Sequence, residues 1–152
     1  MNEPSQPPFV PEDFAVPGEL TTDQFRLQPL GPEHNADDYQ AWTSSMEHIH
    51  ATPGWEESRW PRPMTLEENL ADLERHAADF AARSGFTYTV LDHEGAEIIG
   101  CVYIYPSGVP GGALAESWVR ADRAQLDGAL YHAVLAWLKS AWPFTVINYA
   151  ER

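Results

Sequence analysis

The alternation of apolar and polar residues over the last hundred positions constrains the fold of this chain most strongly. In chain order it predicts a helix over 65–83, strands over 86–92 and 97–105, a third strand ending at 118–120, a second helix, and a last strand over 144–149. Strands and helices mixed in this order predict an α+β domain of three layers, with a central mixed sheet flanked by helices.

Local signals support several of these elements. Thr65-Leu-Glu-Glu68 is a capping box, which predicts the start of the first long helix. Its apolar stripe is expected to comprise Leu66, Leu70, Leu73, Ala77 and Phe80. Gly85 is placed to end this helix in a left-handed cap. Upstream, the sequence predicts a strand over 25–30 and a helix over 35–45, followed at 48–63 by a long loop of the kind that often carries function.

The first residues have a different composition from the rest. Residues 1–18 contain five prolines and no Lys or Arg, which predicts an extended, partly disordered arm before a single domain over 19–152. Phe9, Val10, Phe14 and Val16 are apolar residues that could attach part of this arm to the domain.

Composition excludes several classes of function. The formal net charge of −14, from 23 acidic residues against 9 Lys and Arg, argues against binding to nucleic acid or to an anionic membrane surface. Cys101 is the only cysteine, so an internal disulfide and a Cys-rich zinc site are excluded. His48 and His50 lack a clear third ligand, and no metal site is predicted. Without a signal-peptide pattern or a membrane span, we expect a cytoplasmic protein.

The run Glu19-Leu-Thr-Thr-Asp-Gln-Phe-Arg-Leu-Gln-Pro-Leu30 and the element order over 19–149 resemble the GNAT superfamily of acyl-CoA-dependent N-acyltransferases, in particular its ribosomal-protein acetyltransferases. The resemblance implies that acyl-CoA lies in a V between two diverging parallel strands, here near 117–120 and 144–149. Backbone N–H groups at the start of the following helix would hold the diphosphate. The residues assigned to this site are Trp118, Val119, Arg120, Gln125, Gly128 and Ala129.

The phosphate-binding loop of the family matches only in part. Gln125 and Gly128 fit its first half, but Leu130 then takes the last position. In the other register Ala129 fits the end, but Asp127 replaces the first glycine. Asp122-x-x-Gln125 is also a capping box, and a helix that started at residue 123 would consume the loop.

The same resemblance implies catalytic and substrate-binding residues. Glu116, on the third core strand, would act as the general base, and Tyr149 would donate a proton to the leaving thiolate. Backbone N–H groups flanking Val119 would stabilise the oxyanion. Trp55 and Trp60, in the long loop, would line the acceptor site. The alternatives are a solvated strand end for Glu116, an ordinary edge aromatic for Tyr149, and packing over the helices for the two tryptophans.

These residues predict an enzyme that transfers an acetyl or other acyl group from acyl-CoA to the amine of a small molecule or peptide, without a metal. A non-catalytic GNAT-fold binding or assembly module with a degenerate CoA site is the alternative. The family usually continues into a further helix and two strands, whereas this chain stops at Arg152. The apolar strand over 144–149 would then be an open edge, which predicts a homodimer, or else an arm folded across it.

Overall fold

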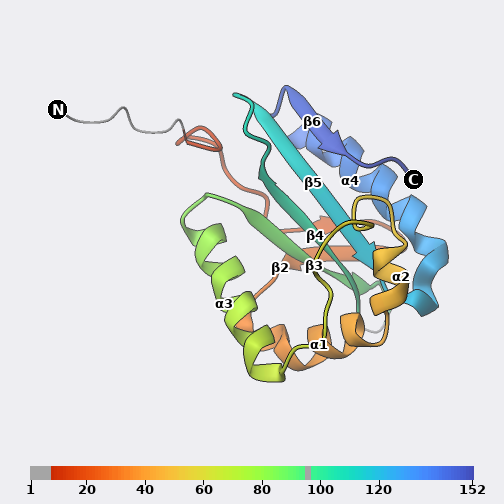
Figure 1. Ribbon diagram of the computed structural model, residues 1–152. Coiled ribbons are helices and arrows are strands. Elements are labelled where there is room, and N and C mark those ends of the chain that lie inside the picture. Colours follow the sequence, from red (N-terminus) through yellow and green to blue (C-terminus); the bar gives the residue numbers. More distant parts are fainter. Residues whose placement is uncertain (1–7, 95–96) are drawn as a thin grey trace.

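The computed structural model describes residues 8–94 and 97–152, and these form one six-stranded sheet in the order β1-β2-β3-β4-β5-β6 (Figure 1). The strands are β1 (Leu20–Thr21), β2 (Phe25–Pro29), β3 (Phe86–Asp92), β4 (Ile98–Pro106), β5 (Gly112–Val119) and β6 (Val146–Tyr149). Neighbouring strands are antiparallel except β5 and β6, which are parallel. The predicted α+β class and central mixed sheet are confirmed.

Helices cover both faces of the sheet. The helical elements are η1 (Pro32–His34), α1 (Asn35–Thr43), α2 (Met46–His50), α3 (Leu66–Ala81), η2 (Ala121–Leu126) and α4 (Asp127–Ala141). Apolar residues of α4 pack on one face around Val102 and Ile104, whereas α1, α2 and α3 contribute to a second cluster around Cys101 and Trp118 on the other. The sheet therefore separates two cores, because successive residues of a strand point to opposite faces.

The start of α3 follows the predicted capping box. The Thr65 hydroxyl accepts a hydrogen bond from the Glu68 N–H (3.1 Å), and the Glu68 carboxylate accepts one from the Thr65 N–H (2.9 Å). Leu66 does not join the buried stripe, however, because it is 42% exposed. The buried residues of α3 are Asn69 and Leu73, so the buried face includes a polar residue that the predicted apolar stripe did not contain.

The end of α3 differs from the prediction. Arg83, with φ of 61°, adopts the left-handed conformation that was expected at Gly85. Gly85 is needed for a different reason: a Cβ atom there would collide with the ring of Tyr105. The turn at Arg83 brings its guanidinium to the carbonyl oxygens of Pro11 (2.6 Å) and Phe14 (2.9 Å).

These contacts attach the N-terminal segment to the domain. Val10 is buried in the core, and Phe9 stacks on Phe86 and Phe144 at centroid distances of 5.7 and 5.1 Å. The Tyr88 hydroxyl donates to the Pro17 carbonyl (2.6 Å). Packing therefore extends to residues before 19, and the boundary at that position stays a prediction. Residues 1–7 of the predicted arm lie outside the described residues. Within the described parts of the chain, no helix is long and apolar enough to cross a membrane.

Candidate functional site: a strand divergence beside an acidic and aromatic cavity

The parallel strands β5 and β6 pair only over part of their length. The pairs run from Gly112 with Val146 to Ala115 with Tyr149, and β5 continues to Val119 without a partner on that side. Beyond the last pair, the Ser117 carbonyl accepts a hydrogen bond from the Trp55 indole (2.9 Å) instead of from β6. We call this region the β5–β6 divergence; Figure 1 shows β6 leaving β5 at this point.

Arg152 fills the inner part of the β5–β6 divergence. Its guanidinium donates to the Ser117 carbonyl (2.8 Å) and forms a 2.6 Å ion pair with Asp127, the first residue of α4. The Arg152 side chain is only 5% exposed, and it lies 5.8 and 5.7 Å from the ring centroids of Tyr131 and Tyr149. The carboxylate at the start of α4 is thus neutralised by a cation from beyond β6.

A smaller cavity of about 110 Å³ borders this ion pair. It brings together Glu116, Tyr149 and Arg152, with Pro53 and Gly54 from the α2–α3 loop (residues 51–65). Burial raises the pKa of Glu116 above its usual value. Burial also raises the pKa of Tyr149 to about 12, and its hydroxyl lies 2.5 Å from the Ser117 hydroxyl.

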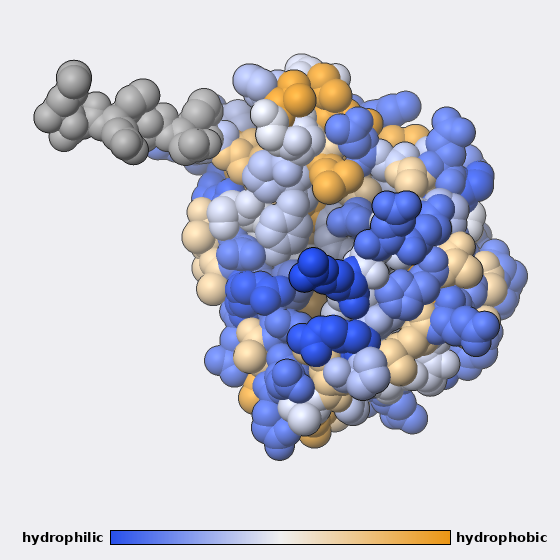
Figure 2. Space-filling view, in the orientation of Figure 1, coloured by the Kyte–Doolittle hydropathy of each residue, from blue (hydrophilic) through white to orange (hydrophobic). Residues whose placement is uncertain are grey.

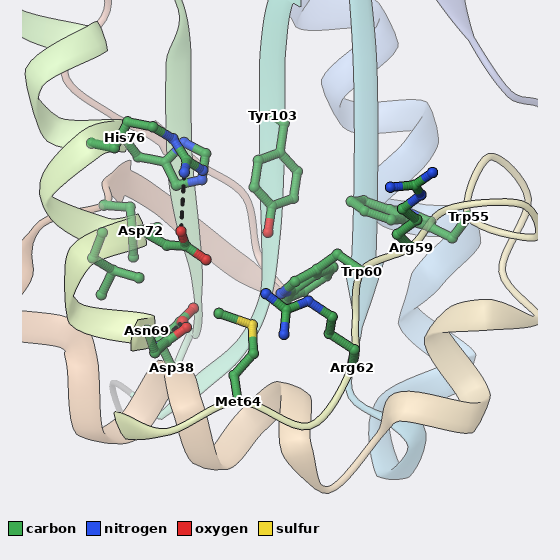
Figure 3. Close-up of a pocket in the computed structure, with 13 residues that line it drawn as sticks. Asp38, Trp55, Arg59, Trp60, Arg62, Met64, Asn69, Asp72, His76 and Tyr103 are labelled. Carbon is green, nitrogen blue, oxygen red and sulfur yellow. Dashed lines mark hydrogen bonds and ion pairs between the residues drawn. The ribbon is translucent and has the colours of Figure 1, made fainter. Parts of the chain in front are cut away.

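A larger cavity of about 340 Å³ lies on the same face of the sheet, between α1, α3 and the α2–α3 loop. Figure 3 shows Asp38, Asn69 and Asp72 on the helical side and Arg59 and Arg62 on the loop side. The aromatic rings of Trp55, Trp60 and Tyr103 form much of the remaining wall. In Figure 2, strongly hydrophilic side chains gather in the middle of this face of the molecule.

Trp55 links the larger cavity to the β5–β6 divergence. Its ring lines the larger cavity, where it packs edge-on against Tyr103 (5.5 Å) and at a tilt against Trp60 (5.4 Å), while its indole N–H reaches Ser117. Tyr103 is the register partner of Glu116, so these two neighbours share one face of the sheet. The loop that carries Trp55 is held by His50, whose ring nitrogen is 2.6 Å from the Pro61 carbonyl.

Comparison with solved structures finds the same architecture. The structure of a protein from Vibrio cholerae, described as a putative ribosomal-protein-serine acetyltransferase, superposes with a TM-score of 0.61 over 80% of this chain and 67% of its own, at 16% identity. The ribosomal-protein-S5-alanine acetyltransferase from Vibrio fischeri gives 0.62, with 81% and 68% coverage and 14% identity. The microcin self-immunity acetyltransferase MccE, solved with acetyl-CoA and AMP, gives 0.59, with 78% and 62% coverage and 12% identity.

The chain has the GNAT fold. It spans between 62% and 68% of the length of these three proteins. No family model and no curated protein matches the sequence. The resemblance to GNAT proteins that the sequence predicted is therefore confirmed for the fold. Sequence identities of 12% to 16% support a common fold and no finer conclusion.

In this GNAT fold, the segment assigned to the diphosphate is a 3-10 helix interrupted by non-helical backbone at Arg123 (φ −125°, ψ 24°) and followed by the start of α4. Residues 121–126 form the 3-10 helix η2, and α4 begins at Asp127, so Gly128 and Ala129 lie in its first turn and Gln125 is exposed on η2. The Arg123 N–H donates to the Arg120 carbonyl (2.9 Å), and the Ala121 N–H donates to the Ser45 hydroxyl (2.8 Å). Two N–H groups that precede the first turn of α4 are thus already bonded within the chain.

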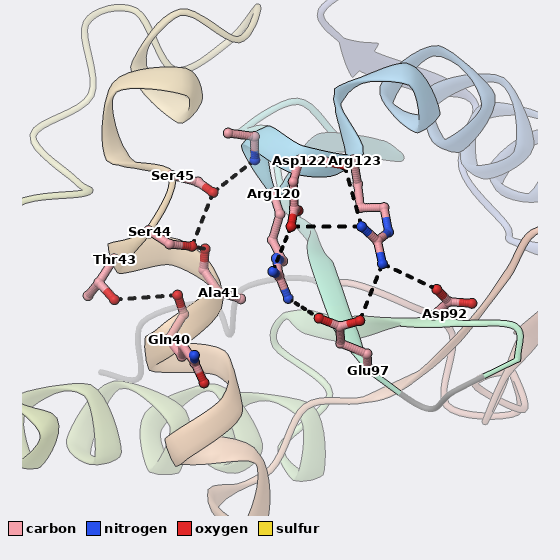
Figure 4. A network of polar contacts seen from close by, with 11 residues as sticks. Gln40, Ala41, Thr43, Ser44, Ser45, Asp92, Glu97, Arg120, Asp122 and Arg123 are labelled. Atoms are coloured by element: carbon pink, nitrogen blue, oxygen red, sulfur yellow. Dashed lines mark hydrogen bonds and ion pairs between the residues drawn. The ribbon is translucent and has the colours of Figure 1, made fainter.

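The two arginines of this segment are also paired. Arg120 contacts Glu97 and Asp122, and Arg123 contacts Glu97 (3.3 Å) and Asp92 (3.6 Å) (Figure 4). Trp118 and Val119 point to opposite faces: the Trp118 indole donates to the Tyr103 hydroxyl (3.0 Å), and Val119 is buried in the α4-side core. Both arginines are thus engaged by carboxylates in this structure, and the assignment of the diphosphate site stays a prediction.

Most residues of the larger cavity were not predicted from the sequence, including Asp38, Asn69, Asp72, His76 and Tyr103. Asp38 shares the buried face of α1 with Ala41 and Trp42, at the i, i+3, i+4 spacing of a core stripe. An acidic residue on a buried helix face was the sequence signal that could have indicated this cavity. Among the described residues, no group of three or more His, Cys, Asp or Glu is arranged to hold a metal ion.

Proposed function

We propose that this protein is an N-acyltransferase that transfers an acyl group from an acyl-CoA to an amine. The observation that carries the proposal is the β5–β6 divergence, which has Glu116 and the larger cavity on one face of the sheet and the Tyr149 side chain, packed against Tyr131 of α4, on the other. The GNAT acetyltransferases with the same fold support it, and MccE is described in complex with acetyl-CoA.

Each predicted group would have a distinct part in the reaction. The acyl-CoA would supply the activated acyl group, with Arg152 displaced. Glu116 would accept the proton of the amine, directly or through a water molecule, and its raised pKa makes it a stronger base than an exposed carboxylate. Tyr149 holds a proton at Oη at neutral pH, which suits donation to the departing thiolate. The Val119 N–H would donate to the carbonyl oxygen under attack.

The second candidate function is binding without catalysis. The specific observation in its favour is the Arg152–Asp127 ion pair, together with the helical state of residues 121–126. An isolated carboxylate at Asp127 would repel a diphosphate, and Arg152 satisfies it from within the chain. Under this alternative, the larger cavity would hold a ligand and the β5–β6 divergence would stay closed.

Isothermal titration with acetyl-CoA, followed by turnover assays with an amine and peptide panel, distinguishes the two functions. An acyltransferase binds acetyl-CoA and releases CoA only when an amine is present. If acetyl-CoA binds neither the natural chain nor the Arg152→Ala variant at millimolar concentration, catalysis is excluded and the binding function is retained.

A further inference from the structure

The larger cavity holds a buried carboxylate that no cation neutralises. Asp38 is 4% exposed and lines the cavity, and within the described parts of the chain it forms no ion pair. Its one hydrogen bond comes from the Asn69 side-chain amide (3.1 Å). Burying a carboxylate without a countercharge is unfavourable, so such a group in a cavity points to a cationic ligand.

The position of this carboxylate is fixed before any ligand arrives. Asn69 also donates to the Asn35 side chain (2.9 Å), and its carbonyl oxygen accepts from the buried Trp42 indole (3.0 Å). These bonds lock the Asn69 amide and, through it, Asp38. Asp72 adds a second carboxylate on the same wall, where it pairs with Arg75 at 3.0 Å.

The opposite wall of the cavity is cationic. Arg59 and Arg62 extend from the α2–α3 loop toward the cavity mouth, facing the helical side that carries Asp38 (Figure 3). Among the described residues neither guanidinium forms an ion pair. The one hydrogen bond that either donates there is a long one, from Arg62 to the Pro63 carbonyl (3.5 Å). Unpaired guanidinium groups match a carboxylate.

The space between the two walls is small and largely aromatic. Trp60 and Tyr103 lie between them, and Met64 completes the lower edge in Figure 3. A volume of about 340 Å³ is at the lower end of the range for small-molecule sites. The rings can pack against the apolar body of a ligand, and an aromatic face can also attract an ammonium group.

We propose that the larger cavity binds a small zwitterion of the amino-acid class, with its ammonium group at Asp38 and its carboxylate at Arg59 and Arg62. A simple amine would leave the arginines unpaired and be repelled by them, whereas a simple anion would be repelled by Asp38. Where the proposed acyltransfer holds, this zwitterion is the acceptor amine, and that assignment alone rests on the proposed function.

The binding step is tested without acyl-CoA, so its result is independent of catalysis. The twenty common amino acids are screened at 10 mM by thermal shift, and the best is titrated calorimetrically beside its amide and its N-acetyl derivative. We expect the free amino acid to bind at least about tenfold more tightly than either derivative. The absence of any shift, or equal binding of the amide, overturns the proposal.

Variants assign the two charges. Asp38→Asn should remove the preference for the free amino acid over the N-acetyl derivative, and Arg62→Gln should remove the preference over the amide. Asp37→Asn on the exposed side of α1 and Arg26→Gln on β2 are the matched controls and should change neither ratio. Circular dichroism confirms folding, and a ratio unaltered in a folded Asp38→Asn protein contradicts the assignment of the ammonium site.

Discussion

At the scale of single residues, the buried carboxylate of Asp38 lines the larger cavity and lowers the stability of the folded protein when it is ionised. Its pKa is raised to about 6 from 3.8, mainly by burial. Between about pH 4 and pH 6 the unfolded chain therefore loses a proton that the folded chain keeps, and stability falls as pH rises through this window. Above pH 6 the full cost is present, roughly 2 to 3 kcal/mol for a shift of this size.

Asp38→Asn should therefore raise the free energy of unfolding at pH 7.5 by roughly 1 to 3 kcal/mol, with little change at pH 4. The asparagine oxygen can still accept the hydrogen bond from Asn69. Urea unfolding at both pH values measures the effect, and Asp37→Asn serves as the control. If the variant is less stable at both pH values, interactions in the folded protein offset the cost of burying the carboxylate, and the prediction is wrong.

Glu116 is the residue on which the proposed chemistry depends most. If the protein is an acyltransferase, Glu116→Gln should lower turnover by roughly 10²- to 10⁴-fold, since a general base contributes that much, and should leave the affinity for acetyl-CoA unchanged. In the natural protein, the turnover rate should rise with pH as Glu116, whose pKa is raised by burial, loses its proton. The exposed Glu74→Gln is the control; an equal loss of acetyl-CoA binding would assign Glu116 to supporting the strand.

At the scale of secondary-structure elements, the Arg152–Asp127 pair decides how β5, β6 and α4 meet. Arg152→Ala would leave Asp127 partly buried without its cation, at a cost of roughly 3 kcal/mol, because removing one partner of a buried pair is strongly destabilising. The double variant Arg152→Ala/Asp127→Ala should recover part of that loss. Chemical denaturation of the single and double variants gives the coupling energy.

The same double variant should open the β5–β6 divergence. With both charged side chains removed, the Ser117 carbonyl and the start of α4 become accessible to a pantetheine and a diphosphate. We expect affinity for acetyl-CoA to increase at least about tenfold, measured by titration calorimetry, with Glu151→Gln as the control. An affinity that does not change would mean that η2, rather than the ion pair, excludes CoA.

At the scale of the whole molecule, β6 ends the sheet. Among the described residues it pairs with β5 alone, and Val146 on β6 and Leu114 on β5 are 43% and 39% exposed. The described part of the N-terminal segment packs on the α4-side core through Val10 and Phe9 rather than as a strand beside β6. The prediction of a homodimer through this edge therefore stands as a proposal, since open apolar edges favour pairing.

Light scattering after size exclusion should give twice the chain mass for the natural protein, and Val146→Lys should lower it toward the monomer. A charge at this exposed edge position disfavours strand pairing without emptying the core. Lys139→Gln, on α4, provides the control. A monomer across the micromolar range would contradict the dimer.

The sequence by itself determined the elements whose signals are local. Strand β3 was predicted at its observed bounds, and the cap of α3 at Thr65, because alternation and capping depend on residues a few positions apart. The order of those elements was enough to predict the GNAT fold. The assignment of Glu116 and Tyr149 to one site rests on the same resemblance in element order, which fixes which strands are neighbours, and it stays a prediction.

Only the tertiary structure decided what fills the site. The contacts of Arg152 with Asp127 and of Asp38 with Asn69 join positions 25 and 31 residues apart. No periodicity within one element encodes such pairs, because they depend on how the elements pack. The choice between a phosphate loop and a helix at 121–126 is similar, because two overlapping local signals competed there. The structure has a 3-10 helix with a kink at Arg123, followed by α4 from Asp127, and the Arg120 and Arg123 side chains are paired to distant carboxylates.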